Sequence, residues 1–383
     1  MWWDSKNVDG FYVIKISAAF VEIYQSMAHK QETLDDSEAW IAARRYVDLM
    51  GKVPTSFQTT IRTLLVDQRA TPPVISPASH FLVTRFLRGH TMKALFYYAT
   101  LTYHGDEIAN TPYLSSGQLV RLFTPGELAA MIAVIYAFRR IRQKASPQPW
   151  REICDHMTPE VDVGMHMGMA IPAIGGMVGV LTGAMPNLAL GLFLLHDQGI
   201  FARYLEEVSP HERDAAEELE KELWGCTARH VACAMMQNFG LSVPVAHGLF
   251  LGLSPSPPRD DKEEPWGYAF AIAREWITSL REHGSPPERV HKGRYYPLQT
   301  AMHRLLYRVN RMRERGCEYR WLERTKDDIS VEKTPQLFQE ALFEAQNTGV
   351  LKDFYKKHLP GEILESLSED DLSQIASGEE VEE

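Results

Sequence analysis

The sequence predicts an all-α fold, a multi-helix bundle, from two kinds of helix signal and from the near absence of strand signals. Helix starts recur as a Ser or Thr followed by Pro, because the hydroxyl accepts from a free amide and Pro suits the first helical position. Glycines follow several apolar-periodic runs, where a left-handed residue commonly ends a helix. Alternating β-branched runs are almost absent, and no hairpin dipeptide separates such runs.

Helices are expected along the chain from the spacing of apolar residues and from these start and stop signals. In Thr124-Pro125-Gly126-Glu127, the Glu stands where it can accept from the amide of Thr124, which completes a capping box. The predicted helices cover residues 11–29, 37–50, 55–68, 78–102, 115–122, 126–145, 159–185, 187–205, 210–224, 228–239, 243–252, 266–283, 297–315, 335–348 and 350–357.

Other local signals set individual helix boundaries. Further starts are expected at Thr158-Pro159, at the capping box Ser209-Pro210-His211-Glu212 and at Thr334-Pro335. Stops are expected at Gly225, Gly240 and Gly349.

Residues 164–195 carry no charge, and a stretch of this length is long enough to cross a membrane. However, Pro172 and Pro186 interrupt it, and Ala, Gly and Met outnumber Leu, Ile and Phe. These features favour two tightly packed, buried helices that are broken at Pro186-Asn187. The methionines of this region are expected to fill the core at close helix contacts. No membrane span is therefore expected.

The composition is that of a globular protein with an acidic C-terminal end. Of a formal net charge of −10, residues 359–383 contribute nine carboxylates and no Lys or Arg. Such a block is typical of a disordered, solvated tail, and the charge balance argues against nucleic-acid binding. The four cysteines stand far apart, and the N-terminus lacks a signal-peptide pattern, so a cytoplasmic location is expected.

The sharpest chemical signal is a His-Asp pair at the end of an apolar helix. His196 and Asp197 are followed by Gly199, and His166 stands thirty positions before His196 on the preceding predicted helix. Imidazole and carboxylate groups that converge from two helices suit Mn, Fe or Mg, and such an ion could activate water for attack on a phosphate. The simpler interpretations are that His166 and His230 are hydrogen-bonded core histidines and that Asp197 pairs with His166 or caps the next helix.

Around this pair the chain resembles the HD superfamily of metal-dependent phosphohydrolases, and specifically its HDOD branch, the HD-related output domains of bacterial signalling proteins. Glu222-Leu223-Trp224-Gly225 through His230 and then Phe239-Gly240-Leu241 look like the family's downstream succession. Ala94 to Gly105, Pro112 to Ser116 and the helix from Glu127 look like the N-terminal half of an HDOD module. The resemblance covers residues 51–283 and implies an HDOD-like helical core.

The chain departs from the family at several ligand positions, so the resemblance implies a degenerate metal site. Ile200 stands where many HD hydrolases carry a Lys, and Gly252 and Leu253 stand where paired histidines are expected. Glu275, next to Arg274, stands near the position of the final Asp ligand. The vestigial metal-ligand candidates are therefore His166, His196, Asp197 and Glu275.

Three functions are compatible with this degenerate core. The favoured one is a non-catalytic regulatory scaffold in bacterial signal transduction, which contacts another signalling protein and needs no cofactor. The alternative is a phosphohydrolase that uses a divalent ion, Mn, Fe or Mg, to cleave a nucleotide or a cyclic dinucleotide. The third is a protein that binds a phosphorylated small molecule without hydrolysing it.

Four arginines recur at steps of four, three and four residues and so share one face of the helix expected at 297–315. The default interpretation is a solvated face. The sharper hypothesis is an interaction face for an acidic partner or for the chain's own acidic tail, because guanidinium groups pair well with carboxylates. The four residues are Arg304, Arg308, Arg311 and Arg315.

The expected organisation has four parts. Both halves of the central part carry long apolar faces, so they are expected to form one compact body. The parts are a helical extension at 1–50, the HDOD-like core at 51–283 with its HD-like half at about 159–283, a helical C-terminal extension at 284–358 and the acidic tail at 359–383.

Overall fold

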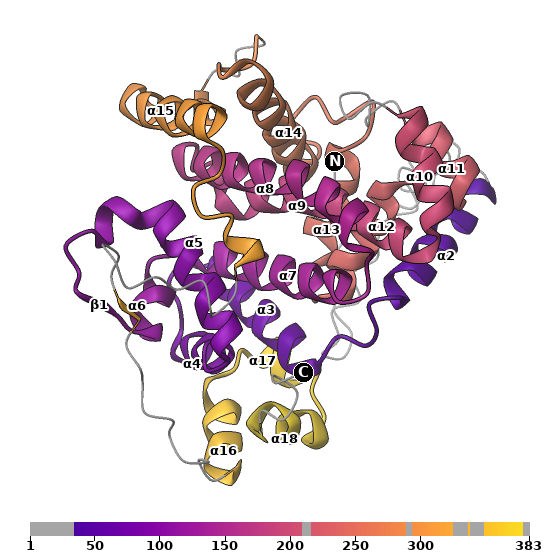
Figure 1. Ribbon diagram of the computed structural model, residues 1–383. Coiled ribbons are helices and arrows are strands. Elements are labelled where there is room, and N and C mark those ends of the chain that lie inside the picture. The colour runs from indigo at the N-terminus through magenta and orange to yellow at the C-terminus, as the bar shows by residue number, and fades with distance from the viewer. Residues whose placement is uncertain (1–33, 209–215, 289–292, 325–335, 338–347, 378–383) are drawn as a thin grey trace, which may run out of the picture.

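The computed structural model describes residues 34–208, 216–288, 293–324, 336–337 and 348–377, and this part of the chain consists mainly of helices (Figure 1). The N-terminal helices are α2 (Leu34–Asp48), α3 (Thr55–Gln68), α4 (Pro77–Phe86), α5 (His90–Ile108) and α6 (Ser116–Arg121). The central helices are α7 (Pro125–Arg142), α8 (Pro147–Ala170), α9 (Gly175–His196), α10 (Gln198–Glu207), α11 (Glu217–Trp224), α12 (Ala228–Asn238), α13 (Val243–Gly252) and α14 (Pro265–His283). The all-α prediction is confirmed.

The C-terminal elements include two 3-10 helices and one short strand. They are η2 (Gly293–Tyr295), α15 (Gln299–Arg315), η3 (Trp321–Glu323), β2 (Gln336–Leu337), α16 (Thr348–His358), α17 (Gly361–Leu364) and α18 (Glu369–Ser377). Strand β2 pairs in parallel with β1 (Tyr113–Leu114), which joins two distant parts of the chain.

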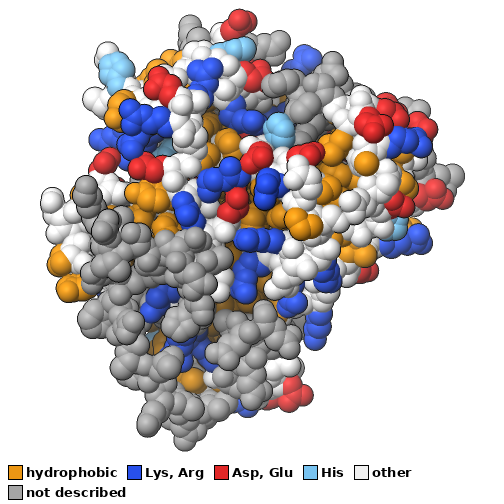
Figure 2. All heavy atoms as spheres, in the orientation of Figure 1, with side chains coloured by type: hydrophobic (Ala, Val, Ile, Leu, Met, Phe, Trp, Pro, Cys, Tyr) orange, Lys and Arg blue, Asp and Glu red, His pale blue; other side chains and the backbone are white. Residues whose placement is uncertain are grey.

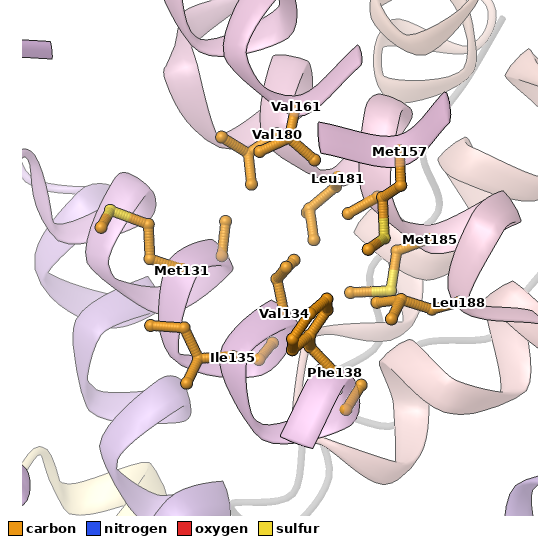
Figure 3. Packing of buried hydrophobic residues seen from close by; sticks show 14 of the residues in the cluster. Met131, Val134, Ile135, Phe138, Met157, Val161, Val180, Leu181, Met185 and Leu188 are labelled. Carbon is orange, nitrogen blue, oxygen red and sulfur yellow. The ribbon is translucent and has the colours of Figure 1, made fainter. Parts of the chain in front are cut away.

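Helices α7, α8 and α9 form the centre of the main hydrophobic core. Figure 3 shows Val134 of α7, Val161 of α8 and Leu181 of α9 among the side chains packed there, and all three are fully buried. The cluster of buried residues around them runs from Ala39 to Leu322. The predicted boundaries after residues 50 and 283 therefore do not separate independent cores.

Helices α8 and α9 run side by side, and their backbones touch. A Cβ atom added to Gly164 would lie 2.2 Å from the Gly179 carbonyl oxygen, and one added to Gly179 would lie 1.9 Å from the Gly164 carbonyl oxygen. Near the turn between the helices, a Cβ atom added to Gly168 would lie 2.3 Å from the Gly175 carbonyl oxygen. Glycine is required along this contact because any side chain would occupy the volume of the opposite backbone.

Two prolines lie inside these helices, which overturns two sequence predictions. Pro159 lies within α8 and Pro186 within α9, so the predicted start at Thr158-Pro159 and the predicted break at Pro186-Asn187 are wrong. The chain reverses instead after Ala170, and Gly175 takes a φ of 76° where α9 begins. Each proline removes one helical hydrogen bond, and the close packing of two buried helices offsets that loss.

Helix α9 is the one described helix that is long and apolar enough to cross a membrane. Within the molecule, 89% of its apolar window is buried, as in the core helix of a globular protein. Met165, Met177 and Met185 are buried along the same contact, which confirms their predicted role as core residues.

Several local predictions are confirmed and others are not. Helices α3 and α13 have the predicted bounds, Thr124 and Glu127 form the predicted capping box, and Gly225 is a left-handed C-cap. The helix expected at 78–102 is divided between α4 and α5, and Gly349 lies at the beginning of α16 instead of ending a helix. The helix expected at 11–29, the capping box at 209–212 and the start at Thr334-Pro335 lie outside the described residues.

The acidic tail contains two helices, α17 (Gly361–Leu364) and α18 (Glu369–Ser377), where the composition predicted disorder. Leu359, Ile363 and Ile375 are buried, whereas Glu369 and Asp370 face solvent. The composition alone suggested a solvated block, but its apolar residues are spaced so that they bury one side of α17 and α18. Residues 378–383 lie outside the described residues.

Candidate functional site

His166, the first metal-ligand candidate, lies on α8 in contact with α5 and α15. Its Nδ1 atom is 3.3 Å from the Arg308 guanidinium, and its ring packs edge-on against Tyr103 with 5.3 Å between ring centroids. Burial, with further contributions from Arg308 and His104, lowers the pKa of His166 to about 3. The imidazole is therefore neutral near pH 7, and it is held between the Arg308 guanidinium and the Tyr103 ring.

The His-Asp pair lies at the far end of the α8–α9 pair. Ser146, just before α8, donates to the Gln198 side chain at 2.6 Å, so the C-terminal end of α9 lies beside the N-terminal end of α8. His166 is twenty residues further along α8 from Ser146, which corresponds to about 30 Å of helix. The expected convergence of His166 with His196 and Asp197 is therefore wrong.

Asp197 acts as a helix cap. Its Oδ1 atom accepts from the amides of Gly199 and Ile200 at 2.8 and 2.9 Å, and thus caps α10. The neighbouring His196 is exposed and packs edge-on against Tyr46. The prediction that Asp197 pairs with His166 is wrong, whereas the alternative prediction that it caps the next helix is confirmed.

The remaining metal-ligand candidate, Glu275, is half-buried on α14. Its neighbour Arg274 donates to the carbonyl oxygens of Leu253 and Ser254 at the end of α13. Within the described residues, no group of three or more His, Cys, Asp or Glu side chains could hold a metal ion. These residues do not fit the divalent ion that the resemblance to HD enzymes implies.

His230 is a core histidine, as the simpler interpretation predicted. Its Nδ1 atom lies 2.6 Å from the Thr227 hydroxyl in a capping box at the start of α12, and its ring packs between Trp40 and Phe250. Burial, followed by the charges of nearby Arg229 and Lys221, lowers the pKa of His230 to about 4.

The four arginines of α15 do not form one exposed basic surface. Arg308 turns inward and donates to the Tyr103 carbonyl oxygen, whereas Arg311 pairs with Glu318 at 2.8 Å. Arg304 and Arg315 are exposed. The described part of the acidic tail lies at the other end of the molecule in Figure 1, against α3 and α4.

The structure brings together a different set of charged residues, in a cleft bounded by α8, α9, α11, α12 and α14. The cleft has a volume of about 420 Å³, which lies within the range of small-molecule pockets. Its apolar lining includes Leu190 and Ile277, and its polar lining consists of His156, Glu160, Thr182, Asn187, Tyr204, Glu217, Glu220, Arg229, Arg274, Thr278, Arg281 and Glu282.

Two ion pairs fix guanidinium groups at the wall of this cleft. Arg229 of α12 binds Glu217 of α11 through two hydrogen bonds of 2.5 and 3.0 Å, and its guanidinium lies over the Phe250 ring at 4.3 Å. Arg281 of α14 is paired with Glu160 of α8. All four side chains are less than one-third exposed, at 16%, 16%, 28% and 24%. Each pair joins two of the helices that line the cleft.

Glu220 is the most deeply buried carboxyl group of the cleft. It accepts from the Tyr204 hydroxyl at 3.0 Å and from the Ala228 amide at 2.6 Å, which lies in the first turn of α12. It therefore holds α10, α11 and α12 together and satisfies one of the free amides of the α12 N-terminus.

The break in α9 hydrogen bonding at Pro186 lies in the same cleft. Since Pro186 has no N–H, the Thr182 carbonyl oxygen lacks the donor that a helix normally supplies, and both residues line the cleft. The adjacent Asn187 donates to Glu160 at 2.7 Å and to the Gly183 carbonyl oxygen at 3.0 Å. The cleft thus presents carbonyl and carboxylate acceptors together with guanidinium donors.

Charge is unevenly distributed around the molecule. Figure 2 shows Lys and Arg side chains gathered down the middle of one face and acidic side chains gathered over α10 and α11. Three acidic residues occupy the first turn of α11, namely Glu217, Glu218 and Glu220. Carboxylates are favourable at a helix N-terminus, so this cluster is partly explained by helix stability.

A separate polar cluster lies between α5, α8 and η3. The buried carboxyl group of Asp162 accepts from the Tyr103 hydroxyl at 2.8 Å and from the Trp321 indole at 3.2 Å. Burial raises the pKa of Asp162 to about 6, above its ordinary value of 3.8. The cluster ties the segment after α15 to the main core.

Sequence reasoning did not identify the cleft. Its residues come from helices that are far apart along the chain, and none of them forms a local motif. Two neighbouring signals were noted for other reasons, namely the Pro186-Asn187 pair in an apolar run and Arg274 beside Glu275.

Comparison with known proteins does not identify a family. No protein-family model matches the chain, and no curated protein or solved structure matches it significantly.

Proposed function

We propose that the chain is a non-catalytic regulatory scaffold of bacterial-type, cytoplasmic signal transduction, and that its cleft binds a phosphorylated small molecule. The observation that carries this proposal is the pair of half-buried Arg–Glu contacts that join helices at the wall of the cleft. The HDOD resemblance supports the signalling role, and another signalling protein is the expected partner.

A phosphate group suits the guanidinium groups of the cleft. Arginine binds phosphate through paired N–H donors, and these hydrogen bonds strengthen when water is partly excluded. The N–H donors of Arg229 and Arg281 are engaged by Glu217 and Glu160 before any ligand arrives, so a phosphate must compete with these two carboxylates.

Ligand binding at these pairs would change how the helices are held together. A phosphate that takes over Arg229 would release Glu217, and with it the contact between α12 and α11. The same exchange at Arg281 would release Glu160 of α8 from α14. A ligand with different affinities for the closed and released arrangements shifts the population between them, which is the basis of a regulatory response.

The alternative, a metal-dependent phosphohydrolase, is not favoured by the geometry. His166 and the His196-Asp197 pair lie at opposite ends of α8, and Asp197 is engaged as a helix cap. A hydrolytic site would need these groups around one ion.

Thermal denaturation of the full chain with matched ligands tests the proposal. The panel contains nucleoside phosphates and a cyclic dinucleotide, each paired with its unphosphorylated nucleoside. Inorganic phosphate is tested as well. A phosphorylated ligand at a hundred times its Kd should raise the free energy of unfolding by about 2.7 kcal/mol and be recovered unchanged, whereas its nucleoside should have no effect.

The cleft variants are Arg229→Gln and Arg281→Gln. The matched control is Arg203→Gln on the surface, where the Arg203 side chain is 59% exposed and forms an ion pair with Glu207. The ligand effect should be lost in the cleft variants and kept in the surface variant. Ligand hydrolysis, or equal shifts in all three variants, would overturn the proposal.

A further inference from the structure

The C-terminal segment, defined as α16–α18 at residues 348–377, packs on the α3–α4 face through its own hydrophobic cluster. None of the residues of this cluster belongs to the main core. The side chains that make the contact include Tyr355, Leu359, Leu372 and Ile375 from the segment and Ala78 and Leu82 from α4. Figure 1 shows the segment as a separate layer at one end of the molecule.

Side chains of the α3–α4 face make polar contacts with the segment. The Arg85 guanidinium of α4 donates to the Tyr355 hydroxyl at 3.3 Å and to the Ile375 carbonyl oxygen. Ile375 lies in the last turn of α18, where carbonyl groups lack helical partners, so Arg85 satisfies one of them. Thr55 of α3 donates to Asp371 at 3.4 Å.

The charges of the two surfaces are complementary. The segment contains six carboxylates and three lysines, and Glu369 is already paired with Lys356 within it. The α3–α4 face carries Arg62, Arg69 and Arg85, and Arg69 lies 3.7 Å from Glu362 of α17. A face that joins apolar side chains to arginines is suited to an amphipathic helix with an acidic polar side.

The segment does not fill the face completely. A cavity of about 330 Å³ remains between α3, α17 and the loop before α13, lined by Leu65, Leu241 and Ile363 together with Arg62 and Arg69. Val243, which also lines this cavity, is 65% exposed. Apolar and basic surface therefore extends beyond the area that the segment covers.

We infer that the α3–α4 face is a docking surface for an acidic amphipathic helix of a partner protein, and that the C-terminal segment occupies it within the chain. The segment is covalently linked, so it competes at a high effective concentration and keeps the surface closed. A partner helix of the same chemistry gains access when the segment is released. This inference is independent of the ligand proposed for the cleft.

Binding of a labelled peptide with the sequence of residues 348–377 to full-length variants tests this inference. Ile375→Asp places a charge in the buried contact, and Gln374→Asp places the same side chain on the exposed side of α18 as the control. The peptide should bind the Ile375→Asp chain at least about tenfold more tightly than the wild type or the control, because the linked competitor is weakened. Added salt should weaken this binding, and a second substitution, Leu82→Asp on α4, should abolish it.

Hydrogen exchange of the unmodified full chain provides a second measurement. The amides of α16 and α18 should exchange together and faster than those of α7 and α9, since opening of the segment leaves the main core folded. Equal peptide binding by all variants, or loss of the main core in Ile375→Asp, would overturn the inference and make the segment a fixed part of the fold.

Discussion

Helices α8 and α9 touch through backbone atoms, whereas the C-terminal segment touches α3 and α4 through the ends of side chains. In the first contact, glycines bring two carbonyl groups to the position that a Cβ atom would need. In the second, Tyr355 and Ile375 meet α4 across a small cluster, and Arg85 supplies the polar link. A backbone contact cannot loosen in small steps, but a contact made by a few side chains can be released as a unit.

The largest effect is expected from Gly179→Ala in the backbone contact. The new methyl group would lie 1.9 Å from the Gly164 carbonyl oxygen, so the helices must separate. We expect the free energy of unfolding to fall by about 3 kcal/mol or more in urea denaturation. The control is Gly105→Ala in α5, where a Cβ atom meets nothing within 4 Å. Similar stabilities of the two variants would show that the α8–α9 contact adapts easily.

The next effect concerns the buried carboxyl group of α8. The pKa of Asp162 is raised to about 6 in the folded protein, so the native state binds more protons than the unfolded state between the ordinary value of 3.8 and about 6. Its contribution to stability is therefore present at low pH and is lost as the pH rises through 6. Asp162→Asn removes this titration.

Denaturation of Asp162→Asn and of the wild type from pH 4 to pH 8 measures this effect. The stability of the wild type relative to the variant should fall by about 1–3 kcal/mol between pH 4 and pH 7. The titration of His166, whose pKa is lowered to about 3, acts in the opposite direction but is common to both proteins. Parallel pH curves would contradict the raised pKa of Asp162.

A smaller effect is expected at Asp197, which belongs to neither of the two contacts. Asp197→Ala removes the acceptor for the Gly199 and Ile200 amides, and the cost of losing such a cap is about 1 kcal/mol. Asp197→Asn keeps an acceptor at the same place and should retain most of the stability. The metal content of the purified protein should be the same in both variants. A loss of bound metal in Asp197→Ala would instead show that Asp197 is a metal ligand.

The smallest effect is expected at Arg69 in the C-terminal contact. Arg69 and Glu362 are 63% and 61% exposed, so solvent screens their interaction, and Arg69→Ala should change the opening free energy of the segment by less than about 0.5 kcal/mol. Arg85→Ala should have a larger effect, because Arg85 satisfies the Ile375 carbonyl oxygen. Hydrogen exchange of α18 measures the opening free energy in both variants. A larger change in Arg69→Ala than in Arg85→Ala would contradict the role of Arg85 in this contact.

Local signals in the sequence predicted much of the fold, because a cap or a stop acts within a few residues. Helices α3 and α13 and the Thr124 capping box were predicted in this way. The predictions at Pro159 and Pro186 failed because the local cost of a proline is smaller than the packing gained along a whole buried helix. The order of the acidic tail was missed because it depends on the α3–α4 face, which no local signal reveals.

The candidate site was far less predictable than the fold. The metal-site prediction assumed that His166 and the His196-Asp197 pair lie at the same end of adjacent helices. The continuation of α9 through Pro186 moves the pair to the opposite end. The cleft depends on pairs such as Arg281 with Glu160, which are separated by 121 positions, and only the folded chain brings them together.

The order of synthesis determines when each of the two contacts can form. The α8–α9 pair joins neighbours in sequence across a short turn, so it can form while the rest of the chain is still being synthesised. The bond between Arg85 and Ile375 spans 290 positions and can form only after Ile375 has been added to the chain. During synthesis, the α3–α4 face is therefore not covered by α16–α18 until these helices have left the ribosome. A protein that binds this face has its earliest opportunity on the nascent chain.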